Sequence, residues 1–177
     1  MKEYKEIQVA LLGLGTVGLG VYKVLQMQKE EMQHKIGTEI KIKKILVRNL
    51  EKAAGKIEDA SVLTDSWQEI VNDDEIQIVI EVMGGMEPAR TYIMEAMQAG
   101  KQVVTANKDL IAADGKELMD QAKKSGCDLL FEAAVAGAIP IIRPLKQCLA
   151  GNHLSEIMGI VNGTTNFILT KMAQERV

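Results

Sequence analysis

Short apolar segments alternate along this chain with longer segments in which apolar residues recur every three or four positions. The short segments are nearly continuous aliphatic runs, a pattern typical of parallel strands buried on both faces. We predict strands at residues 7–12, 40–47, 76–82, 102–105, 128–132 and 156–161. We predict helices at residues 16–33, 66–71, 89–99, about 114–124 and 144–148, and one that starts at Phe167. Residues 51–59 are polar and are expected to be irregular.

Glycine, proline and small polar residues predict where several of these helices begin and end. Gly37 and Gly100 follow helical segments and are expected to end them. Pro88 suits the first turn of the helix at 89–99. Asp65 or Ser66 is the expected N-cap of the helix at 66–71.

The alternation of strands and helices predicts the fold class. Strands joined by helices at these spacings form parallel βαβ units, whose right-handed crossovers place helices on both faces of one open sheet. We therefore predict an α/β fold with a doubly wound parallel sheet. Small residues and prolines gather at residues 136–144, where we expect a domain boundary.

The composition narrows the class of protein. The 177 residues are 47% hydrophobic, which argues against general disorder, and the net charge of −3 gives no electrostatic footprint for nucleic acid or an anionic membrane. We expect neither a membrane span nor a signal peptide, because the start of the chain is charged and the apolar runs are short. Cys127 and Cys148 have no metal-ligand spacing and are read as reduced thiols of a cytoplasmic protein. His34 and His153 are expected at the surface.

The first strand runs directly into a glycine motif. Gly13, Gly15 and Gly18 have G-x-G-x-x-G spacing, and a helical segment follows them. In a dinucleotide-binding turn the first glycine permits a tight bend, the second allows a pyrophosphate to approach, and the third lets the helix pack on the strand. A glycine turn with a purely structural role is the alternative, but the strand–turn–helix context favours nucleotide binding.

Ligands of open α/β sheets bind beyond the carboxyl ends of the strands, so the residues at the other strand exits are further candidates. Arg48 follows the second strand, where a guanidinium suits the 2′-phosphate of NADP better than the ribose of NAD, although a surface arginine is the alternative. Gly84 and Gly85 follow the third strand as either a cofactor contact or a flexible turn. Lys108 follows the fourth strand and either polarises a carbonyl or is simply solvated.

Two further segments have candidate chemistry and a simpler alternative. Residues 162–166 (NGTTN) could bind the polar end of a small substrate, or could form a turn with Thr164 or Thr165 as helix N-cap. Glu132 lies at a strand exit among small residues, where a carboxylate and turned carbonyls suit a hard cation. From its neighbours alone, a solvated or ion-paired glutamate is the favoured interpretation.

Four segments together resemble one enzyme family. They are residues 13–18 (GLGTVG), 103–108 (VVTANK), 131–140 (FEAAVAGAIP) and 159–169 (GIVNGTTNFIL). In this order they look like homoserine dehydrogenase of the bacterial type. That resemblance covers the whole chain and implies reduction of aspartate 4-semialdehyde to homoserine with NADPH or NADH, on the route to threonine, methionine and isoleucine.

The resemblance also implies roles for individual residues. The cofactor contacts would be Gly13, Leu14, Gly15, Thr16, Val17, Gly18, Arg48, Gly84, Thr105 and Lys108. Lys108 would also be catalytic, Gly163 and Thr164 would line the substrate pocket, and Arg48 would make NADP(H) preferred over NAD(H). Glu132, with the backbone oxygens of Val135, Gly137 and Ile139, matches the family's monovalent cation site, usually assigned to sodium.

The family pattern continues beyond the residues present here. Its substrate-holding Glu and Asp, its proposed proton-donating Lys and most of its dimerising sheet follow the NGTTN helix. We therefore expect residues 1–136 to form an NAD(P)-binding Rossmann domain and residues 137–177 to begin an α+β catalytic domain. The full-length protein would be a homodimer, and this amino-terminal portion would bind cofactor but turn over homoserine poorly or not at all.

Two other functions fit parts of the sequence. A cofactor-binding module without catalysis, such as a nucleotide sensor, would need only the glycine turn. Another semialdehyde or hydroxy-acid dehydrogenase could share the fold, but the TANK and NGTTN segments fit the homoserine dehydrogenase pattern better.

Overall fold

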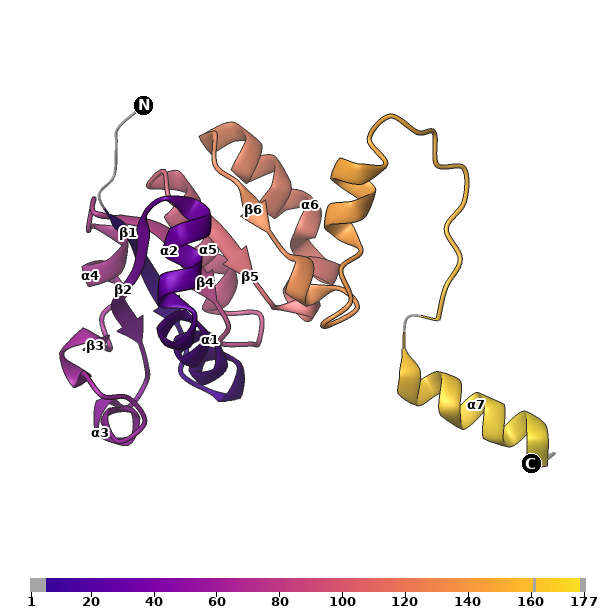
Figure 1. The fold of residues 1–177 in the computed structure, drawn as a ribbon, viewed down its shortest axis with the longest axis horizontal. Helices are drawn as coiled ribbons and strands as arrows, with labels where there is room; N and C mark the ends of the chain where they lie inside the picture. Colours follow the sequence, from indigo (N-terminus) through magenta and orange to yellow (C-terminus); the bar gives the residue numbers. More distant parts are fainter. Residues whose placement is uncertain (1–5, 161, 176–177) are drawn as a thin grey trace.

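A parallel sheet forms the centre of the molecule (Figure 1). The computed structural model describes residues 6–160 and 162–175. Its six-stranded sheet has the order β3-β2-β1-β4-β5-β6, with all neighbouring strands parallel. The strands are β1 (Glu6–Leu12), β2 (Glu39–Leu46), β3 (Leu63–Thr64), β4 (Ile76–Glu81), β5 (Gln102–Thr105) and β6 (Leu129–Leu130). The order reverses between β1 and β4, which confirms the predicted doubly wound α/β fold.

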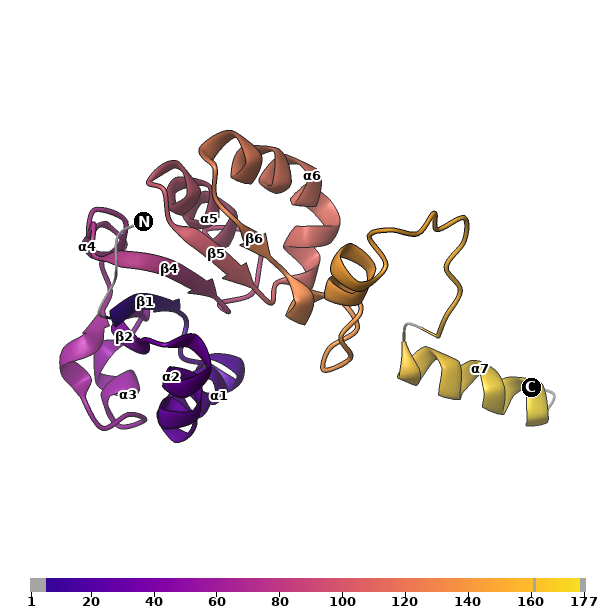
Figure 2. The ribbon, with the colours of Figure 1, turned by 45° about the horizontal axis from the view of Figure 1, so that its top comes forward.

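Helices connect the strands and cover both faces of the sheet. The α-helices are α1 (Thr16–Met27), α2 (Lys29–Ile36), α3 (Leu50–Ala54), α4 (Gln68–Val71), α5 (Ala89–Gln98), α6 (Lys108–Ser125) and α7 (Gly163–Glu175). Two 3-10 turns, η1 (Ala60–Val62) and η2 (Glu132–Ala134), and a π-helical turn, η3 (Pro144–Cys148), complete the regular structure of the described residues. Figures 1 and 2 show α5 and α6 on one side of the sheet and α1 on the other.

Neighbouring residues of β1 point into two separate core layers. Ala10 and Leu12 belong to the larger layer, which includes Ile93 of α5 and Leu118 of α6. Leu11 belongs to the smaller layer, against which α1 packs. Because successive side chains of a strand point to opposite faces, a run of apolar residues is what a doubly covered strand requires.

The predicted helix at 16–33 is divided in the structure. α1 ends at Met27, and α2 begins at Lys29 after Gln28, whose φ of −105° and ψ of 15° interrupt the helix. α2 has no fully buried residue, so burial does little to hold the two segments in one continuous helix. The predicted end is confirmed, because Gly37 caps α2 with a left-handed φ of 81°.

Side-chain caps explain two other errors. The helix expected from about 114 begins at Lys108, because Asn107 accepts a hydrogen bond from the amide of Leu110. The segment 51–59 is partly helical rather than irregular, because the side chain of Asn49 caps α3 through the amide of Lys52. Neither Asp65 nor Ser66 caps α4, which follows Trp67 without a side-chain cap.

The strand expectations fail towards the carboxyl end of the chain. β6 contains only Leu129 and Leu130 of the predicted 128–132, and η2 begins at Glu132. Residues 156–160 are not a strand, since no neighbouring strand supplies their hydrogen bonds, and residue 161 lies outside the described residues. α7 begins at Gly163 rather than Phe167, because Asn162, and not Thr164 or Thr165, accepts a hydrogen bond from a first-turn amide.

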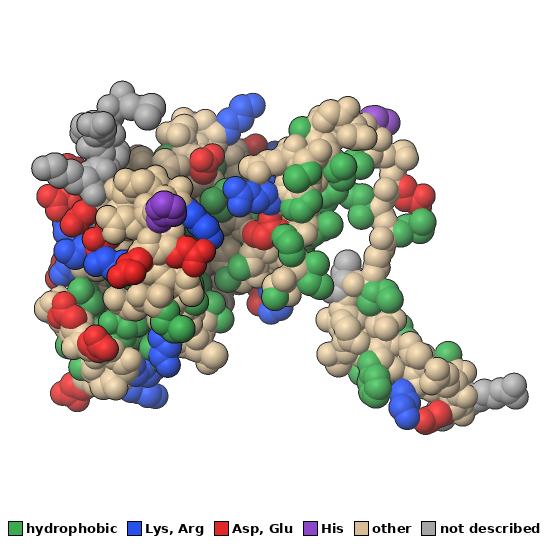
Figure 3. All heavy atoms as spheres, viewed as in Figure 1, with side chains coloured by type: hydrophobic (Ala, Val, Ile, Leu, Met, Phe, Trp, Pro, Cys, Tyr) green, Lys and Arg blue, Asp and Glu red, His purple; other side chains and the backbone are tan. Residues whose placement is uncertain are grey.

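The described residues from 151 onward extend away from the sheet. Residues 151–160 are exposed and without regular structure, and α7 lies beyond them, separated from the sheet in Figures 1 and 2. Hydrophobic side chains are exposed along this part of the molecule in Figure 3, whereas charged side chains gather over the sheet. Within the described residues, no helix is long and apolar enough to cross a membrane.

Candidate nucleotide-binding site

The glycine turn between β1 and α1 is tightly packed at its first and third glycines. Gly13 has a φ of 100°, which favours glycine, and its amide donates to the carbonyl of Leu46 at 2.9 Å. A Cβ at Gly13 would lie 3.1 Å from the Cα of Met83. A Cβ at Gly18 would overlap the carbonyl oxygen of Gly13. The motif therefore brings the helix onto the strand, as its spacing predicts.

The second glycine faces open space. A Cβ at Gly15 would have no heavy atom within 4 Å, and its φ of −78° is accessible to any residue. Gly15 is also the N-cap of α1 and makes no side-chain capping bond. The amides of the first helical turn have no intrahelical acceptor, and the helix dipole adds partial positive charge there. These properties suit an anion such as pyrophosphate.

A cavity of about 640 Å³ lies at the carboxyl edge of the sheet beside this turn. It is bounded by the exits of β1, β2, β3 and β4 and by the start of α5. The lining residues are Gly13, Leu14, Gly15, Leu46, Val47, Arg48, Asn49, Lys52, Ala53, Lys56, Asp65, Val82, Met83, Pro88 and Tyr92. The volume is in the range of known small-molecule sites.

Three basic residues, Arg48, Lys52 and Lys56, are among those that line this cavity. Arg48 is exposed and, among the described residues, has no hydrogen bond or ion pair. Lys52 and Lys56 line the same cavity, and the Lys56 Nζ donates to the carbonyl of Leu14 at 3.0 Å. The sequence reasoning identified Arg48 but missed the two lysines. Their spacing of four residues across the end of α3 was the available signal.

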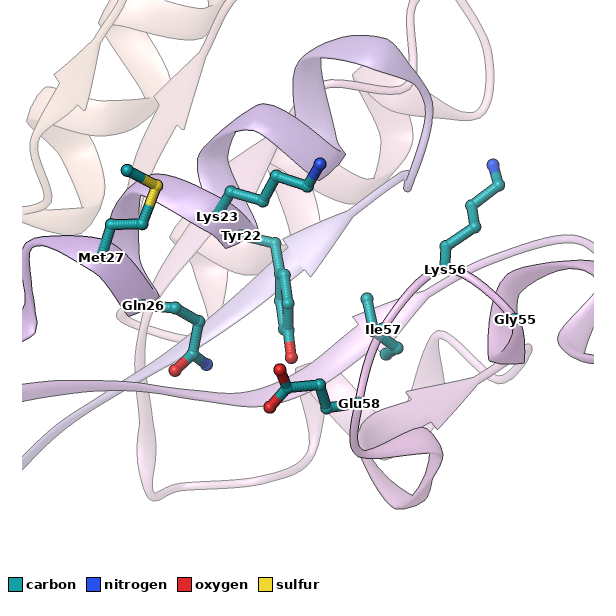
Figure 4. A pocket seen from close by; sticks show the side chains of 8 residues that line it. All are labelled: Tyr22, Lys23, Gln26, Met27, Gly55, Lys56, Ile57 and Glu58. Carbon is teal, nitrogen blue, oxygen red and sulfur yellow. The ribbon is translucent and has the colours of Figure 1, made fainter.

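A second hollow lies on the flank of α1 (Figure 4). It measures about 480 Å³ and is lined by Tyr22, Lys23, Gln26, Met27, Gly55, Lys56, Ile57 and Glu58. The side chains of Tyr22, Gln26 and Glu58 converge in Figure 4. Lys56 is shared with the larger cavity, but the glycine turn and the strand exits are not part of this hollow. The larger cavity is therefore the candidate nucleotide site.

A buried polar network joins the exits of β4 and β5. Glu81 is fully buried at the end of β4, and its carboxylate accepts hydrogen bonds from the amides of Met83 and Gly84 at 2.8 and 3.3 Å. The hydroxyl of Thr105, also fully buried, donates to Glu81 at 2.6 Å. The sequence reasoning missed Glu81, although an acidic residue at the end of an aliphatic strand is an unusual signal.

Lys108 and Thr105 are close in sequence but differ in accessibility. Lys108 opens α6, and its side chain is 76% exposed, with Nζ 3.6 Å from the carboxylate of Asp109. The Thr105 hydroxyl is used within the protein, so a cofactor contact there would fall to its backbone. Gly84 is exposed and has a φ of 74°. Its loop thus lies at the surface between the two strand exits.

The remaining predicted cofactor contacts differ in how they face the solvent. Thr16 and Val17 are exposed in the first turn of α1, with Val17 54% exposed. Leu14 is 5% exposed and packs in the smaller core layer. Its backbone, rather than its side chain, is therefore the part that lines the cavity.

Glu132 is held by the backbone of the segment that follows it. Its carboxylate accepts hydrogen bonds from the amides of Ile141, Ile142 and Arg143 at 2.6, 2.9 and 2.8 Å. These bonds, first that from Ile141, hold the pKa of Glu132 below its ordinary value. Among the described residues no group of three or more His, Cys, Asp or Glu could hold a metal ion, so any cation there would need backbone oxygens.

The predicted substrate residues are not beside the other candidates in this structure. Gly163 and Thr164 are exposed at the start of α7. Figures 1 and 2 show α7 apart from the carboxyl edge of the sheet, where Lys108 and the glycine turn lie. Of the predicted cofactor contacts, Gly13, Leu14, Gly15 and Arg48 line the cavity, whereas Lys108, Thr105 and Gly84 lie outside its lining, as do the predicted substrate residues.

The sheet order, the glycine turn and the adjacent cavity define a dinucleotide-binding domain of the Rossmann class. A family model described as the NAD-binding domain of homoserine dehydrogenase matches residues 13–132. A second model, described as homoserine dehydrogenase, matches residues 140–177. The chain belongs to the homoserine dehydrogenase family.

Similar proteins include enzymes and solved structures of that name. The homoserine dehydrogenase of Bacillus subtilis is 49% identical over 97% of this chain and 40% of its own length. A structure from Thiobacillus denitrificans has a TM-score of 0.86 at 46% identity and covers 98% of this chain and 40% of that one. A hyperthermophilic archaeal homoserine dehydrogenase in complex with NADPH has a TM-score of 0.78 at 29% identity, over 96% and 57% of the two chains. The present chain spans about 40% of the length of the curated relatives it matches.

Proposed function

We propose that NADP(H) binds in the cavity at the carboxyl edge of the sheet. One observation carries the proposal: Gly15 leaves open space at the uncapped start of α1, while Gly13 and Gly18 fix that helix against the sheet. A pyrophosphate beside Gly15 would accept hydrogen bonds from the first-turn amides. The exposed side chains of Thr16 and Val17 would flank it.

The basic residues that line the cavity support a preference for NADP(H) over NAD(H). Arg48 has no partner among the described residues and can offer forked hydrogen bonds to a 2′-phosphate. Lys52 and Lys56 add positive charge to the lining of the same cavity. The archaeal relative solved with NADPH shows that the family includes a protein that binds this cofactor.

For the whole protein we propose the interconversion of aspartate 4-semialdehyde and homoserine. The bound cofactor would supply the hydride that reduces the aldehyde carbon. Lys108 would lie beside the nicotinamide, where its ammonium could donate a hydrogen bond to the reacting oxygen. The exposure of Lys108 and its place at a strand exit support this role. Gly163 and Thr164 would contact the substrate.

We further propose the pathway, the location, the oligomeric state and the domain division of the whole protein. Homoserine formation lies on the route to threonine, methionine and isoleucine. We place the protein in the cytoplasm and expect the full-length enzyme to be a homodimer. Residues 1–136 would form the cofactor-binding domain and residues 137–177 the beginning of the catalytic domain; the two family matches, which end at 132 and begin at 140, support that division.

We also propose that a sodium ion binds at the loop after β6. Two amides occupy Oε1 of Glu132, but Oε2 accepts only one and so keeps a free lone pair. No hydrogen bond within the described residues ends on the carbonyls of Val135, Gly137 or Ile139. Residues 136 and 138, which alternate with them, have left-handed φ values of 51° and 65°. These residues therefore fit a hard monovalent cation.

The experiment that tests the proposed function is a titration of the chain with NADPH and NADH, combined with an assay of homoserine oxidation. We expect saturable binding with NADPH preferred, and little or no turnover by these 177 residues. A version extended by the further segment that the relatives carry should regain turnover. Absence of binding, or rapid turnover by the chain alone, would contradict the proposal.

A further inference from the structure

The buried carboxylate of Glu81 occupies the middle of the carboxyl edge. β4 lies between β1 and β5, and Glu81 pairs in register with Leu12 on one side and Thr105 on the other. A fully buried carboxylate loses its hydration and is tolerated only when hydrogen bonds replace it. Here three donors, the amides of Met83 and Gly84 and the hydroxyl of Thr105, make that replacement.

These bonds close into a ring through Asn107. The amide of Asn107 donates to the Thr105 hydroxyl oxygen at 3.0 Å, and its side-chain Nδ2 donates to the carbonyl of Gly85 at 2.6 Å. The loop of residues 83–85 is thus fixed by hydrogen bonds to the carboxylate of Glu81 and to the side chain of Asn107. Gly84 and Gly85 have left-handed φ values of 74° and 78°, so the loop has little intrinsic preference for this shape.

Two residues of this ring, Met83 and Asn107, contact elements with predicted functions. Met83 lies against Gly13, as the 3.1 Å between its Cα and a Cβ placed at Gly13 shows. Asn107 is the N-cap of α6, and Lys108 is the first residue of that helix. The ring therefore links the glycine turn to the helix that carries Lys108.

We propose that Glu81 is a positioning residue for the nicotinamide end of the cofactor. It acts through the loop at 83–85 and through Thr105 and Asn107, and it is itself too buried to touch a ligand. This inference rests on the proposed function, and it adds a residue that sets where the nicotinamide lies relative to Lys108. The adenosine end, at Arg48 and Lys52, is formed by other elements and should be insensitive to Glu81.

The test compares NADPH with 2′,5′-ADP, a fragment that carries only the adenosine end. Glu81→Gln replaces one acceptor oxygen by an NH₂ donor, which faces groups that already donate. We expect NADPH affinity to fall about tenfold while affinity for 2′,5′-ADP changes less than about twofold. The ratio of the two affinities is unaffected by a general loss of folded protein, so a merely structural role would not change it.

Two other variants keep the test decisive. Asn107→Ser keeps an N-cap oxygen but loses the bond to Gly85, and it should shift the same ratio in the same direction. Lys101→Met removes a buried polar group at the opposite edge of the sheet and should leave the ratio unchanged. Without any cofactor, Glu81→Gln should also speed amide exchange at Met83 and Gly84 relative to the rest of the chain.

The outcomes separate this inference from the proposed function. If the unaltered chain binds neither NADPH nor 2′,5′-ADP, the proposed function fails and this inference fails with it. If the chain binds both, and Glu81→Gln and Asn107→Ser leave the affinity ratio unchanged, only the role of Glu81 is overturned. Unchanged exchange at Met83 and Gly84 would also overturn it, whatever the cofactor does.

Discussion

Two lysines at opposite ends of β5 meet very different surroundings. Lys101, just before the strand, is 3% exposed, and its Nζ donates to the carbonyls of Asp73 and Ile76 at 2.7 and 3.1 Å. Lys108, just after the strand, has a side chain that is 76% exposed and lies 3.6 Å from Asp109. The first ammonium is satisfied within the protein, while the second is available to a ligand.

This contrast extends along the two edges of the sheet. Before β4, Asp73 also pairs with Lys43 at 2.7 Å, and burial lowers the pKa of Lys101. At the carboxyl edge lie an open cavity, the uncapped start of α1, and Arg48, which has no partner among the residues that the structure describes. This difference indicates that side chains at the amino ends of the strands mainly stabilise the fold, whereas those at the carboxyl ends are available to bind a ligand. Substitutions at the two edges should therefore separate the two properties.

The largest expected effect is on the free energy of unfolding, at Gly18, where the glycine turn of the carboxyl edge is also closely packed. Gly18→Ala would force its methyl group onto the carbonyl of Gly13 and should lower the free energy of unfolding by about 3 kcal/mol. Gly20→Ala, in the same helix but facing open space, should instead raise it by up to about 1 kcal/mol. Urea denaturation of both variants measures this difference, and equal values would contradict the packing described for Gly18.

Arg48→Ala should give the next largest effect, on binding alone. A charge-assisted contact with the 2′-phosphate is worth about 1.5–3 kcal/mol, so NADPH affinity should fall roughly tenfold to a hundredfold. NADH affinity should change less than about twofold. Lys41→Ala, which removes an exposed cation of β2, serves as the matched control. Equal losses for NADPH and NADH would show that Arg48 does not contact the phosphate.

The two lysines themselves give a direct comparison of the edges. Lys101→Met leaves two backbone carbonyls without this donor and should lower the free energy of unfolding by about 1–2 kcal/mol. Lys108→Met removes an exposed charge and should change it by less than about 0.5 kcal/mol. Thermal or urea unfolding distinguishes the two, and a greater loss at Lys108 would reverse the comparison.

The smallest expected effect is a pH dependence that arises from Glu132, which follows the last strand of the sheet. Because backbone amides lower its pKa when folded, its contribution is complete above the ordinary value of 4.5 and is lost as the pH falls through the lower folded value. The amide resonance of Ile141 should therefore titrate with a midpoint below 4.5. Glu132→Gln should abolish that titration. A midpoint at or above the ordinary value would mean that the three amide bonds do not form in solution.

The sequence predicted five of the six strands of the sheet, because an apolar run marks each of them, and missed the two-residue β3. The aliphatic runs around Leu11 and Val79 give the position of β1 and β4, and glycine spacing predicts the turn after β1. Residues 156–160 show the limit of that reasoning. An aliphatic run indicates burial or pairing, but forming a strand also needs a partner, and Ile157 and Met158 are 63% and 84% exposed here.

The candidate site was only partly predictable for a related reason. Local spacing and a position at a strand exit were enough to identify Gly13, Gly15 and Arg48. Glu81 at a strand end and Lys56 four residues after Lys52 also carry a local signal, but that signal does not give their roles, which depend on contacts with Thr105 and Leu14, distant in sequence. Asn107 illustrates the same point at shorter range, since its capping bond extends α6 well before the position that periodicity suggested.

The most direct test of the central claim, that the glycine turn binds the pyrophosphate of NADP(H), is a calorimetric titration of Gly15→Val with NADPH beside the unaltered chain. A Cβ at this position would have no heavy atom within 4 Å, so the free energy of unfolding should change by only about 1 kcal/mol. The side chain would nevertheless occupy the space that the pyrophosphate needs, and NADPH affinity should fall about a hundredfold or more. A folded Gly15→Val variant that binds NADPH as tightly as the unaltered chain would contradict the account.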